Sequence, residues 1–403
     1  MTPGHPPIVC FPFAGDRVGG SYVSALNLIK HLDPDRYRPL VVLHNTDGKL
    51  ADLLRAEGVA FEAAPGFDLP SLHSDGRRSA RIPGDIGALA RAIPPTTRFL
   101  RRRGVRIVHT NDGRMHSAWA LPTRLARASQ VWHHRSPPDS LGIRYLAPVV
   151  AERIVSVSDF ALPQTCLMRR WGSPRVIRSP FDIDAVGDLD RTASRRRLLS
   201  ELSAAPDTVV VGQFGSMIER KRPLTFVRTV AAMTGKAPGR PIIGVMFGEP
   251  DADMAARINA EIARLGLGDR VHVMGFRYPG LPWIAACDVL LATAVDEPFG
   301  RTLIEAMLVG TAVVATRSGG NAEAIRDDVN GCLAPADDPS ALAERTLALL
   351  LDPAKMAAMR AQARDYVLAN FGLKRHAEAV MAVYDEIVDL RTRPMAATAG
   401  QHG

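Results

Sequence analysis

The sequence predicts an α/β protein built from two doubly wound, parallel-sheet domains. Its 403 residues exceed an ordinary single domain of about 100 to 200 residues. Short apolar runs alternate along the chain with longer amphipathic runs, a pattern typical of βαβ units. The alternation lapses around residues 182–203 and then resumes, so we place the boundary between the two domains there.

The first series of runs predicts a domain over residues 1–188. We expect its strands at 6–13, 38–45, 59–64, 105–111, 129–135 and 153–159, and helices at 21–32, 50–58 and 118–128. The second series predicts a domain over residues 189–372. Its expected strands are 208–215, 241–249, 270–276, 286–294, 311–316 and 331–337, and its expected helices 224–233, 254–266, 300–310, 340–351 and 353–370.

The C-terminal end of the chain is expected to leave the second domain. We expect a helix over residues 373–391 that crosses back to the first domain, followed by a flexible tail over 392–403. Doubly wound sheets bind ligands at the carboxyl ends of their strands. The predicted site therefore lies in a cleft that the two domains face.

The composition limits the kinds of partner. The formal net charge is +8, with arginine clusters at 98–103 and 191–197 and a basic run at 69–84. Solvated helix faces explain such clusters, and so do an anionic membrane surface, a phosphorylated lipid or an acidic donor. Nucleic acid is the least favoured partner, because the arginines are not interleaved with stacking aromatic residues.

The cysteines and the N-terminus predict a cytoplasmic protein, with peripheral contact at the inner face of the membrane as an option. The four cysteines are far apart and form no pattern typical of a metal site. The N-terminal residues lack the basic start and the apolar run that are typical of a secretory leader, so we expect none, and no apolar run of about 18 residues occurs. We expect reduced thiols and neither a metal nor another cofactor.

The most informative motif lies at 296–307, where a strand ends, the chain turns and a helix begins near Arg301. Uncapped backbone N–H groups at such a helix start bind phosphate groups. Glu305 lies about one turn into the helix, where its carboxylate can accept hydrogen bonds from ribose hydroxyls. Glu297, on the turn itself, is placed to meet sugar hydroxyls.

The spacing Glu-x7-Glu within EPFGRTLIEAM, followed by a strand and SGGNAE, resembles the donor-site signature of glycosyltransferase family 4. This resemblance implies a GT-B fold of two Rossmann-like domains and a nucleotide-sugar donor that is used with retention of configuration. Residues implied or expected to bind the donor are Gly19, Gly20, Gly215, Ser216, Lys221, Arg222, Phe276, Glu297, Phe299, Gly300, Arg301, Thr302 and Glu305.

The phosphate-binding turn departs from the family pattern G-R-x-x-x-x-K. Gly215 and Lys221 match it, but Ser216 stands where the arginine is expected. A leaving nucleoside diphosphate needs fixed positive charge. Either Arg220 or Arg222 supplies a second cation, or donor affinity depends on Lys221 alone.

The acceptor side of the site is less well specified. Family members place a histidine after about the fifth strand, close to the reacting sugar, and our first choice is His134, with His133 or Arg135 as alternatives. Strand side chains alternate between faces, so only one of the two histidines can point into the cleft. Asn111 and Asp112 contact the acceptor or simply cap the next helix.

The resemblance implies a mechanism in which the leaving phosphate oxygen takes the proton from the acceptor hydroxyl. We expect Lys221, Glu297 and His134 to be the catalytic residues. The acceptor is a saccharide, a lipid-linked sugar or a small molecule, and the donor a UDP- or GDP-sugar. Two other functions are compatible with the sequence: a sugar-nucleotide epimerase, and a catalytically inactive donor-binding subunit of a glycosylation complex.

Overall fold

The computed structural model of the protein describes residues 5–16, 18–65, 82–163, 174–184, 186–187 and 189–392. Its contacts divide the chain into two compact units. The first comprises Met1–Val157, Leu162–Pro180 and Leu373–Gly403, and the second Ser158–Ala161 and Phe181–Gly372. The basic run predicted at 69–84 lies outside the described residues up to residue 81, as do residues 393–403 of the tail.

The boundary between the units lies at Pro180–Phe181, slightly before the predicted position at 188. Phe181 explains the difference, because it belongs to the second unit by both backbone and side chain. Its N–H donates to the carbonyl of Phe371, and its ring packs against Phe299 and Phe371.

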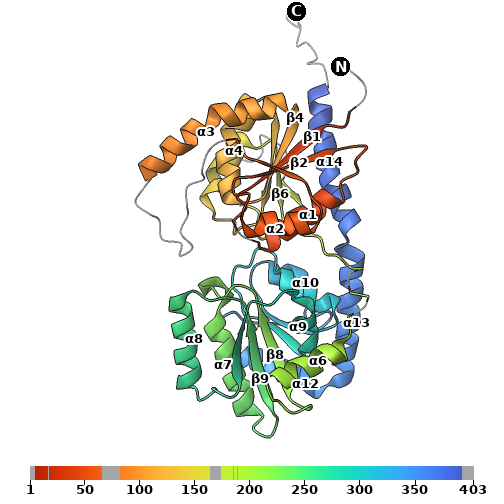
Figure 1. The fold of residues 1–403 in the computed structure, drawn as a ribbon. Coiled ribbons are helices and arrows are strands. Elements are labelled where there is room, and N and C mark those ends of the chain that lie inside the picture. The colour runs from red at the N-terminus through yellow and green to blue at the C-terminus, as the bar shows by residue number, and fades with distance from the viewer. Residues whose placement is uncertain are drawn as a thin grey trace, which may run out of the picture. The chain divides into compact units, whose positions relative to one another are not determined.

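The first unit contains a seven-stranded parallel sheet with strand order β3-β2-β1-β4-β5-β6-β7 (Figure 1). The strands are β1 (Ile8–Phe13), β2 (Arg38–Leu43), β3 (Phe61–Ala63), β4 (Val105–Thr110), β5 (Ser129–His134), β6 (Arg153–Ser156) and β7 (Arg175–Val176). The helices are α1 (Gly20–Lys30), α2 (Lys49–Ala56), α3 (Ile82–Arg102), α4 (Gly113–Leu125), α5 (Ala147–Val150) and α14 (Leu373–Thr392), with a π-helix, η1 (Gly142–Leu146), before α5.

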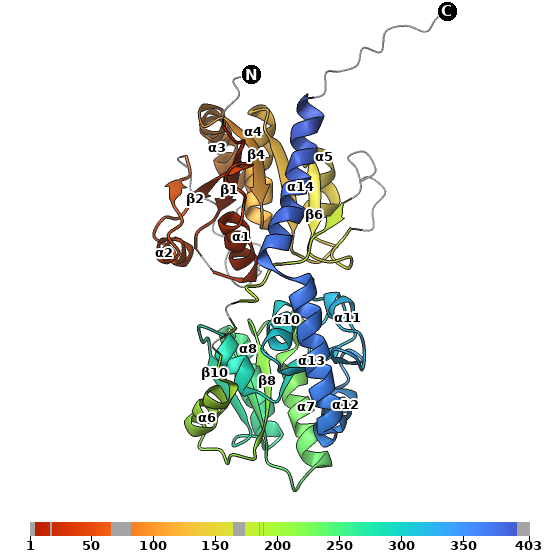
Figure 2. The same cartoon turned by 90° about the vertical axis from the view of Figure 1, so that its right-hand side faces the viewer.

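Alternating side chains of β1 bury both faces of this sheet. Val9, Phe11 and Phe13 pack with residues of α1, α2 and α14. Cys10 packs on the opposite side with residues of α3 and α4. The C-terminal helix α14 therefore supplies part of the core of the first unit (Figure 2).

The helix predicted at 118–128 was wrong in its position, since α4 runs from Gly113 to Leu125. The Asp112 carboxylate accepts hydrogen bonds from the N–H groups of Arg114 and Met115, so the helix begins early. It ends early because Arg127 adopts a positive φ of 60°.

The second unit contains a six-stranded parallel sheet with strand order β10-β9-β8-β11-β12-β13. The strands are β8 (Val209–Phe214), β9 (Ile242–Phe247), β10 (Val271–Gly275), β11 (Val289–Ala292), β12 (Ala312–Thr316) and β13 (Cys332–Ala334). The helices are α6 (Arg191–Glu201), α7 (Pro223–Lys236), α8 (Ala252–Arg264), α9 (Leu281–Ala286), α10 (Arg301–Leu308), α11 (Gly320–Ala324), α12 (Pro339–Leu351) and α13 (Pro353–Asn370).

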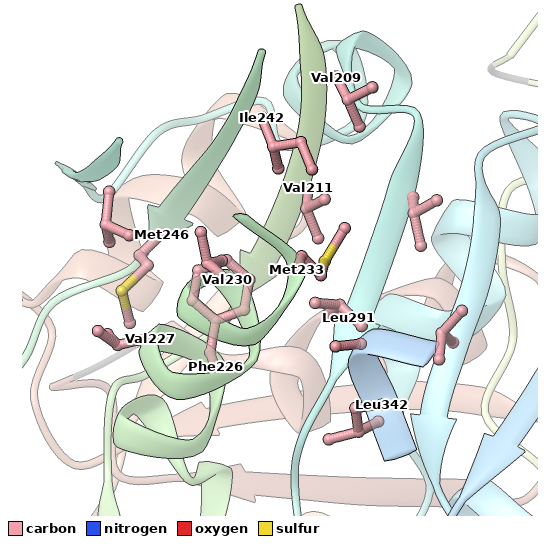
Figure 3. Packing of buried hydrophobic residues seen from close by; sticks show 14 of the residues in the cluster. Val209, Val211, Phe226, Val227, Val230, Met233, Ile242, Met246, Leu291 and Leu342 are labelled. Atoms are coloured by element: carbon pink, nitrogen blue, oxygen red, sulfur yellow. The ribbon is translucent and has the colours of Figure 1, made fainter. Parts of the chain in front are cut away.

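The core of the second unit shows the same alternation. Val209 and Val211 of β8 pack with α7, whose Phe226 and Val230 point back at the sheet, and Leu342 of α12 joins the same cluster (Figure 3). Val210 faces the other side, toward α6 and α9. From β8 the sheet grows in one direction through β9 and β10 and in the other through β11, β12 and β13. The carboxyl ends of the neighbouring strands β8 and β11 therefore form the switch point where such sheets bind ligands.

Candidate active site

The loop after β8 is shaped by close contact between two backbones. Gly215 has a φ of 118°, and its N–H donates to the carbonyl of Phe247 on β9. A Cβ at Gly248 would lie 2.0 Å from the Gly215 carbonyl oxygen, so only glycine fits there. The loop that leads from β8 to the basic turn Glu219–Lys221 is therefore packed against the loop after β9.

Lys221 is fixed by its backbone and reaches the predicted carboxylate with its side chain. Its carbonyl accepts hydrogen bonds from Gln213 Nε2 at 3.0 Å and from Thr293 Oγ1 at 2.8 Å. Its Nζ lies 2.7 Å from Glu297 Oε2. Residues from β8, from the basic turn and from the strand end after β11 thus hold the ammonium group beside Glu297.

Arg220 forms a second ion pair with the same carboxylate, through Nη1 and Glu297 Oε2. Burial of Glu297, which is 9% exposed, would raise the pKa of its carboxyl group. The positive charges of Lys221 and Arg220 outweigh burial and lower that pKa below its ordinary value. Glu297 is therefore a charged acceptor at neutral pH, with two cations gathered on it.

Arg222 lies elsewhere. It adopts a left-handed conformation with φ of 50°, and its guanidinium contacts Glu219 Oε1 at 3.0 Å and Asp337 Oδ1 at 3.1 Å. Of the two arginines considered for the second cation, Arg220 is the one that the structure brings to Glu297.

The Glu297 loop rests on the glycine pair of the SGGNAE motif. Gly319 has φ 56° and ψ −144°, and a Cβ there would lie 2.7 Å from the Glu297 carbonyl oxygen. A Cβ at Gly320 would lie 2.6 Å from the Pro298 carbonyl oxygen, and the Gly320 N–H donates to Glu297 O at 2.7 Å. These two glycines therefore allow close approach between protein loops.

Helix α10 begins directly after this loop. Gly300, with φ of 70°, precedes it and makes no side-chain cap. Within α10, Arg301 Nη2 lies 3.5 Å from Glu305 Oε1, and the Arg301 guanidinium stacks 4.2 Å from the ring centroid of Phe181. Burial raises the pKa of the Glu305 carboxyl group, although Arg301 and Lys221 oppose the shift.

Four of the predicted donor residues surround one small cavity of ≈ 20 Å³: Lys221, Glu297, Gly300 and Thr302. Gln213, Thr293 and Asn321 also line it. Gln213 Oε1 and Asn321 Oδ1 are buried and have no hydrogen-bond partner among the described residues. Sequence reasoning missed these three polar residues, because only the folded sheet brings them next to the motif.

Phe299, Phe276 and Ser216 are among the predicted donor residues that do not line this cavity. Phe299 is buried against Phe181 and Phe371 and anchors the loop. Phe276 follows β10 and is 67% exposed, and Ser216 is also exposed.

The turn between β1 and α1 holds the predicted glycines of the first unit. Gly20 is the first residue of α1, and Gly19 is its extended N-cap, with φ of −155°. A Cβ at Gly19 would meet no heavy atom within 4 Å. Gly15 is the constrained position instead, because its φ is 92° and a Cβ there would lie 2.2 Å from the Asn45 carbonyl oxygen.

Polar side chains also gather at the carboxyl ends of β4 and β5. Asn111 Oδ1 accepts hydrogen bonds from Arg135 Nε and Nη2, both at 3.3 Å, and Arg135 Nη1 donates to Ser179 Oγ at 3.1 Å. Asp112 caps α4 and also accepts from Tyr22 Oη at 3.4 Å, while burial raises the pKa of its carboxyl group. The structure therefore shows the capping role that we considered for Asp112.

The two adjacent histidines are both buried, on opposite faces of β5. His133 Nδ1 lies 3.1 Å from His109 Nε2, and burial together with Arg135 lowers the pKa of His133 well below its ordinary value. His134 Nε2 bonds the Pro137 carbonyl at 3.2 Å, and burial lowers the pKa of His134 to about 4. Both imidazoles are neutral at pH 7, and Arg135 lies beyond them at the strand end.

In the ranges that the structure describes, no group of three or more His, Cys, Asp or Glu side chains is arranged to hold a metal ion. No helix in those ranges is both long and apolar enough to span a bilayer.

Residues 205–352 match the family model for group 1 glycosyl transferases. A D-inositol 3-phosphate glycosyltransferase from Salinispora arenicola is 32% identical over 358 residues, which cover 84% of this chain and 72% of that protein. A lipopolysaccharide core biosynthesis mannosyltransferase, LpsB from Rhizobium meliloti, is 27% identical over 61% of this chain and 67% of its own length.

The fold has close counterparts among solved structures. HepE from Anabaena, solved in complex with UDP and glucose, superposes with a TM-score of 0.77 at 22% identity, over 94% of this chain and 99% of that one. This likeness confirms the predicted fold of two Rossmann-like, parallel-sheet domains. Together with the sequence relatives, it shows that the chain belongs to the group 1 glycosyltransferases and has their GT-B fold.

Proposed function

We propose that this glycosyltransferase moves a sugar from a UDP- or GDP-sugar to an acceptor hydroxyl, with retention of the anomeric configuration. The observation that supports the proposal is the pair of cations, Lys221 and Arg220, gathered on Glu297 beside the uncapped start of α10. Fixed positive charge and helix N–H groups stabilise a leaving diphosphate. Glu297 can give up one of its two ion pairs and accept hydrogen bonds from sugar hydroxyls instead. Glu305 can accept hydrogen bonds from the ribose.

In the proposed reaction the acceptor oxygen bonds to the anomeric carbon on the face that the nucleotide leaves. The bond between that carbon and the phosphate oxygen breaks, and the same phosphate oxygen takes the proton of the acceptor hydroxyl. Lys221, Arg220 and the start of α10 balance the negative charge that grows on the diphosphate. The proposal therefore includes no divalent cation.

The acceptor side of the proposal rests on the first unit. His134 is the proposed sugar-orienting residue, with Arg135 as the alternative, because both end β5 at the carboxyl edge of the sheet. The acceptor is a saccharide, a lipid-linked sugar or a small molecule. The relatives' names mention D-inositol 3-phosphate and the lipopolysaccharide core, so these are the first acceptors to test. We also propose a cytoplasmic location, which the free thiols of Cys10, Cys287 and Cys332 support.

The deciding experiment is calorimetric titration of UDP and GDP into the protein in the presence of EDTA. We expect micromolar binding of one nucleotide and at least about tenfold weaker binding to Lys221→Ala and Glu305→Ala, since each loses a charged contact. UDP comes first because HepE binds it.

Other outcomes of the binding and activity measurements would support a different function or stereochemistry. Binding without turnover of any nucleotide sugar would favour the inactive-subunit reading, for which the serine at position 216 is the reason. Release of free nucleotide without an acceptor would favour an epimerase. An inverted product, detected by the anomeric proton coupling in NMR, would refute retention.

A further inference from the structure

The helices on one face of the first sheet carry large apolar side chains on their solvent side. Leu121 and Leu125 of α4 are exposed, four residues apart. Leu141 lies just before η1, Tyr145 in η1 and Val149 in α5. They are 59%, 59% and 60% exposed and again recur every four residues. Such spacing places each set along one side of its helix. We refer to these five residues as the apolar face.

Hydrogen bonds join the two sets of residues in the apolar face and connect them to α3. Arg124 of α4 donates from Nη1 to the carbonyl of Val149 at 3.1 Å. Arg101, at the end of α3, donates from Nη2 to the carbonyl of Leu125 at 2.6 Å. Helices α3 and α4 lie side by side, as Figures 1 and 2 both show. The apolar face and the basic end of α3 therefore form one continuous surface of the first unit.

This surface has a strong excess of positive charge. Residues 87–138 contain ten arginines and a single acidic residue, Asp112, which is occupied as the cap of α4. Five arginines of α3, α4 and η1 are exposed and form no ion pair within the described residues: Arg98, Arg101, Arg102, Arg124 and Arg144. The acidic residues nearest to this stretch in the sequence are Asp85, before it, and Asp139, directly after it.

The chemistry of the surface fits a lipid bilayer. Aliphatic side chains enter the boundary between headgroups and acyl chains, tyrosine prefers that boundary, and arginines keep their charged ends at the phosphate level. The Arg144 guanidinium carbon lies 5.5 Å from the ring centroid of Tyr145, so an aromatic ring and a cation lie side by side on this surface. A nucleic-acid surface would instead present several stacking aromatic rings.

We propose that the apolar face, together with these five exposed arginines, docks the first unit onto an anionic membrane surface. This surface is built from the outer sides of α3, α4, η1 and α5 and includes none of the donor-site residues of the second unit. The proposal therefore does not depend on which sugar is transferred, and it adds a site of action to the proposed function.

The test is flotation of the full-length protein with vesicles of phosphatidylcholine alone or mixed with phosphatidylglycerol. We expect binding only to the mixed vesicles, and weaker binding as salt rises. The charge variant Arg98→Glu/Arg102→Glu/Arg144→Glu should bind at least about tenfold more weakly. The apolar variant Leu141→Ser/Tyr145→Ser/Val149→Ser should also lose at least about tenfold, and at low salt too.

The matched control, Arg196→Glu/Arg270→Glu/Arg364→Glu, makes the same change in net charge at exposed positions of the second unit. It should bind vesicles like the unmodified protein, and thermal unfolding of every variant, followed by circular dichroism, will show that each has folded. Three results would overturn the proposal: no binding to mixed vesicles, equal loss in the control, or full binding by the apolar variant. A dimer in light scattering that only the apolar variant loses would assign the face to a second copy of the chain instead.

Discussion

Glu297 forms ion pairs with Lys221 and Arg220, and different contacts hold the backbones of these two residues. The Lys221 carbonyl is bonded by side chains from β8 and from the end of β11, and the Arg220 carbonyl accepts from the N–H of Val295. The serine at position 216 leaves the loop without the arginine that the family pattern places there. We infer that Arg220 takes over the charge of that arginine from a position four residues later.

Exchange of Arg220 tests this inference. Arg220→Gln should lower kcat/KM about 10²- to 10³-fold, the effect of removing one donor to a developing negative charge. Arg222→Gln, the matched control, should change kcat/KM less than about threefold, since Arg222 pairs with Glu219 and Asp337. Steady-state kinetics with the donor identified by calorimetry would measure both, and equal losses in the two variants would contradict the assignment.

The choice between these arginines shows where sequence reasoning stops at the residue scale. The motif at 296–307 predicts the two carboxylates, because one loop and one helix turn fix their spacing, and the pattern G-R-x-x-x-x-K predicts Lys221. Arg220 and Arg222 lie in the same basic turn, and only the left-handed backbone at Arg222 directs them to different partners. A single-residue conformation of this kind leaves no periodic signal in the sequence.

At the scale of elements, the site depends on two loops that touch through their backbones. The Glu297 loop follows β11, and the glycine pair follows β12, so neighbouring parallel strands deliver both to one edge of the sheet. The N–H of Gly320 bonds the Glu297 carbonyl and fixes the height of the loop. The position of the Glu297 carboxylate is thus determined by the absence of a side chain in the next loop.

Gly319→Ala should damage both the fold and the activity. The new Cβ would lie 2.7 Å from Glu297 O in a backbone conformation reserved for glycine, so we expect a loss of about 2 to 3 kcal/mol in the free energy of unfolding. A displaced Glu297 should also lower kcat/KM by more than about tenfold.

Gly266→Ala is the control, with φ of 65° and no heavy atom within 4 Å of the new Cβ. It should cost about 1 to 2 kcal/mol and leave kcat/KM unchanged. Urea unfolding and kinetics on both variants would show whether contact with the Glu297 loop, rather than backbone strain alone, impairs catalysis. Wild-type kcat/KM in Gly319→Ala would refute the packing argument.

Most elements were predictable because apolar runs and turn residues define them. The helix α10 begins at Arg301, where the motif places it, and α13 matches its predicted range. The start of α4 was missed because a capping carboxylate, rather than the apolar pattern, sets it. The outer faces of α4 and η1 could not be anticipated either, since exposed leucines read as core positions in the sequence.

For the molecule as a whole, a group of buried histidines in the first unit determines its response to acid. Burial lowers the pKa values of His109, His116, His133 and His134. In the unfolded chain these groups titrate near ~6.5. The unfolded state therefore binds more protons than the folded state below that pH, and stability falls as the pH is lowered.

We expect the melting temperature to fall between about pH 6.5 and pH 4, the interval between the unfolded value and the pKa of about 4 for His134. Glu261, whose pKa is lowered to about 2, loses its contribution only at lower pH. His134→Gln should flatten the pH dependence above pH 5 compared with the unmodified protein. A melting temperature that stays constant from pH 7.5 to 4.5 would contradict the burial of these histidines.

The division of the core also has a consequence for synthesis on the ribosome. Val380, Met381, Tyr384 and Ile387 of α14 complete the core of the first unit, although the rest of that unit precedes Phe181. At roughly 5 to 20 residues per second, the ribosome needs about 10 to 40 s to translate the second unit before it reaches α14. The unit that begins first is thus finished last, and the part of its core that α14 covers stays exposed on the nascent chain until then.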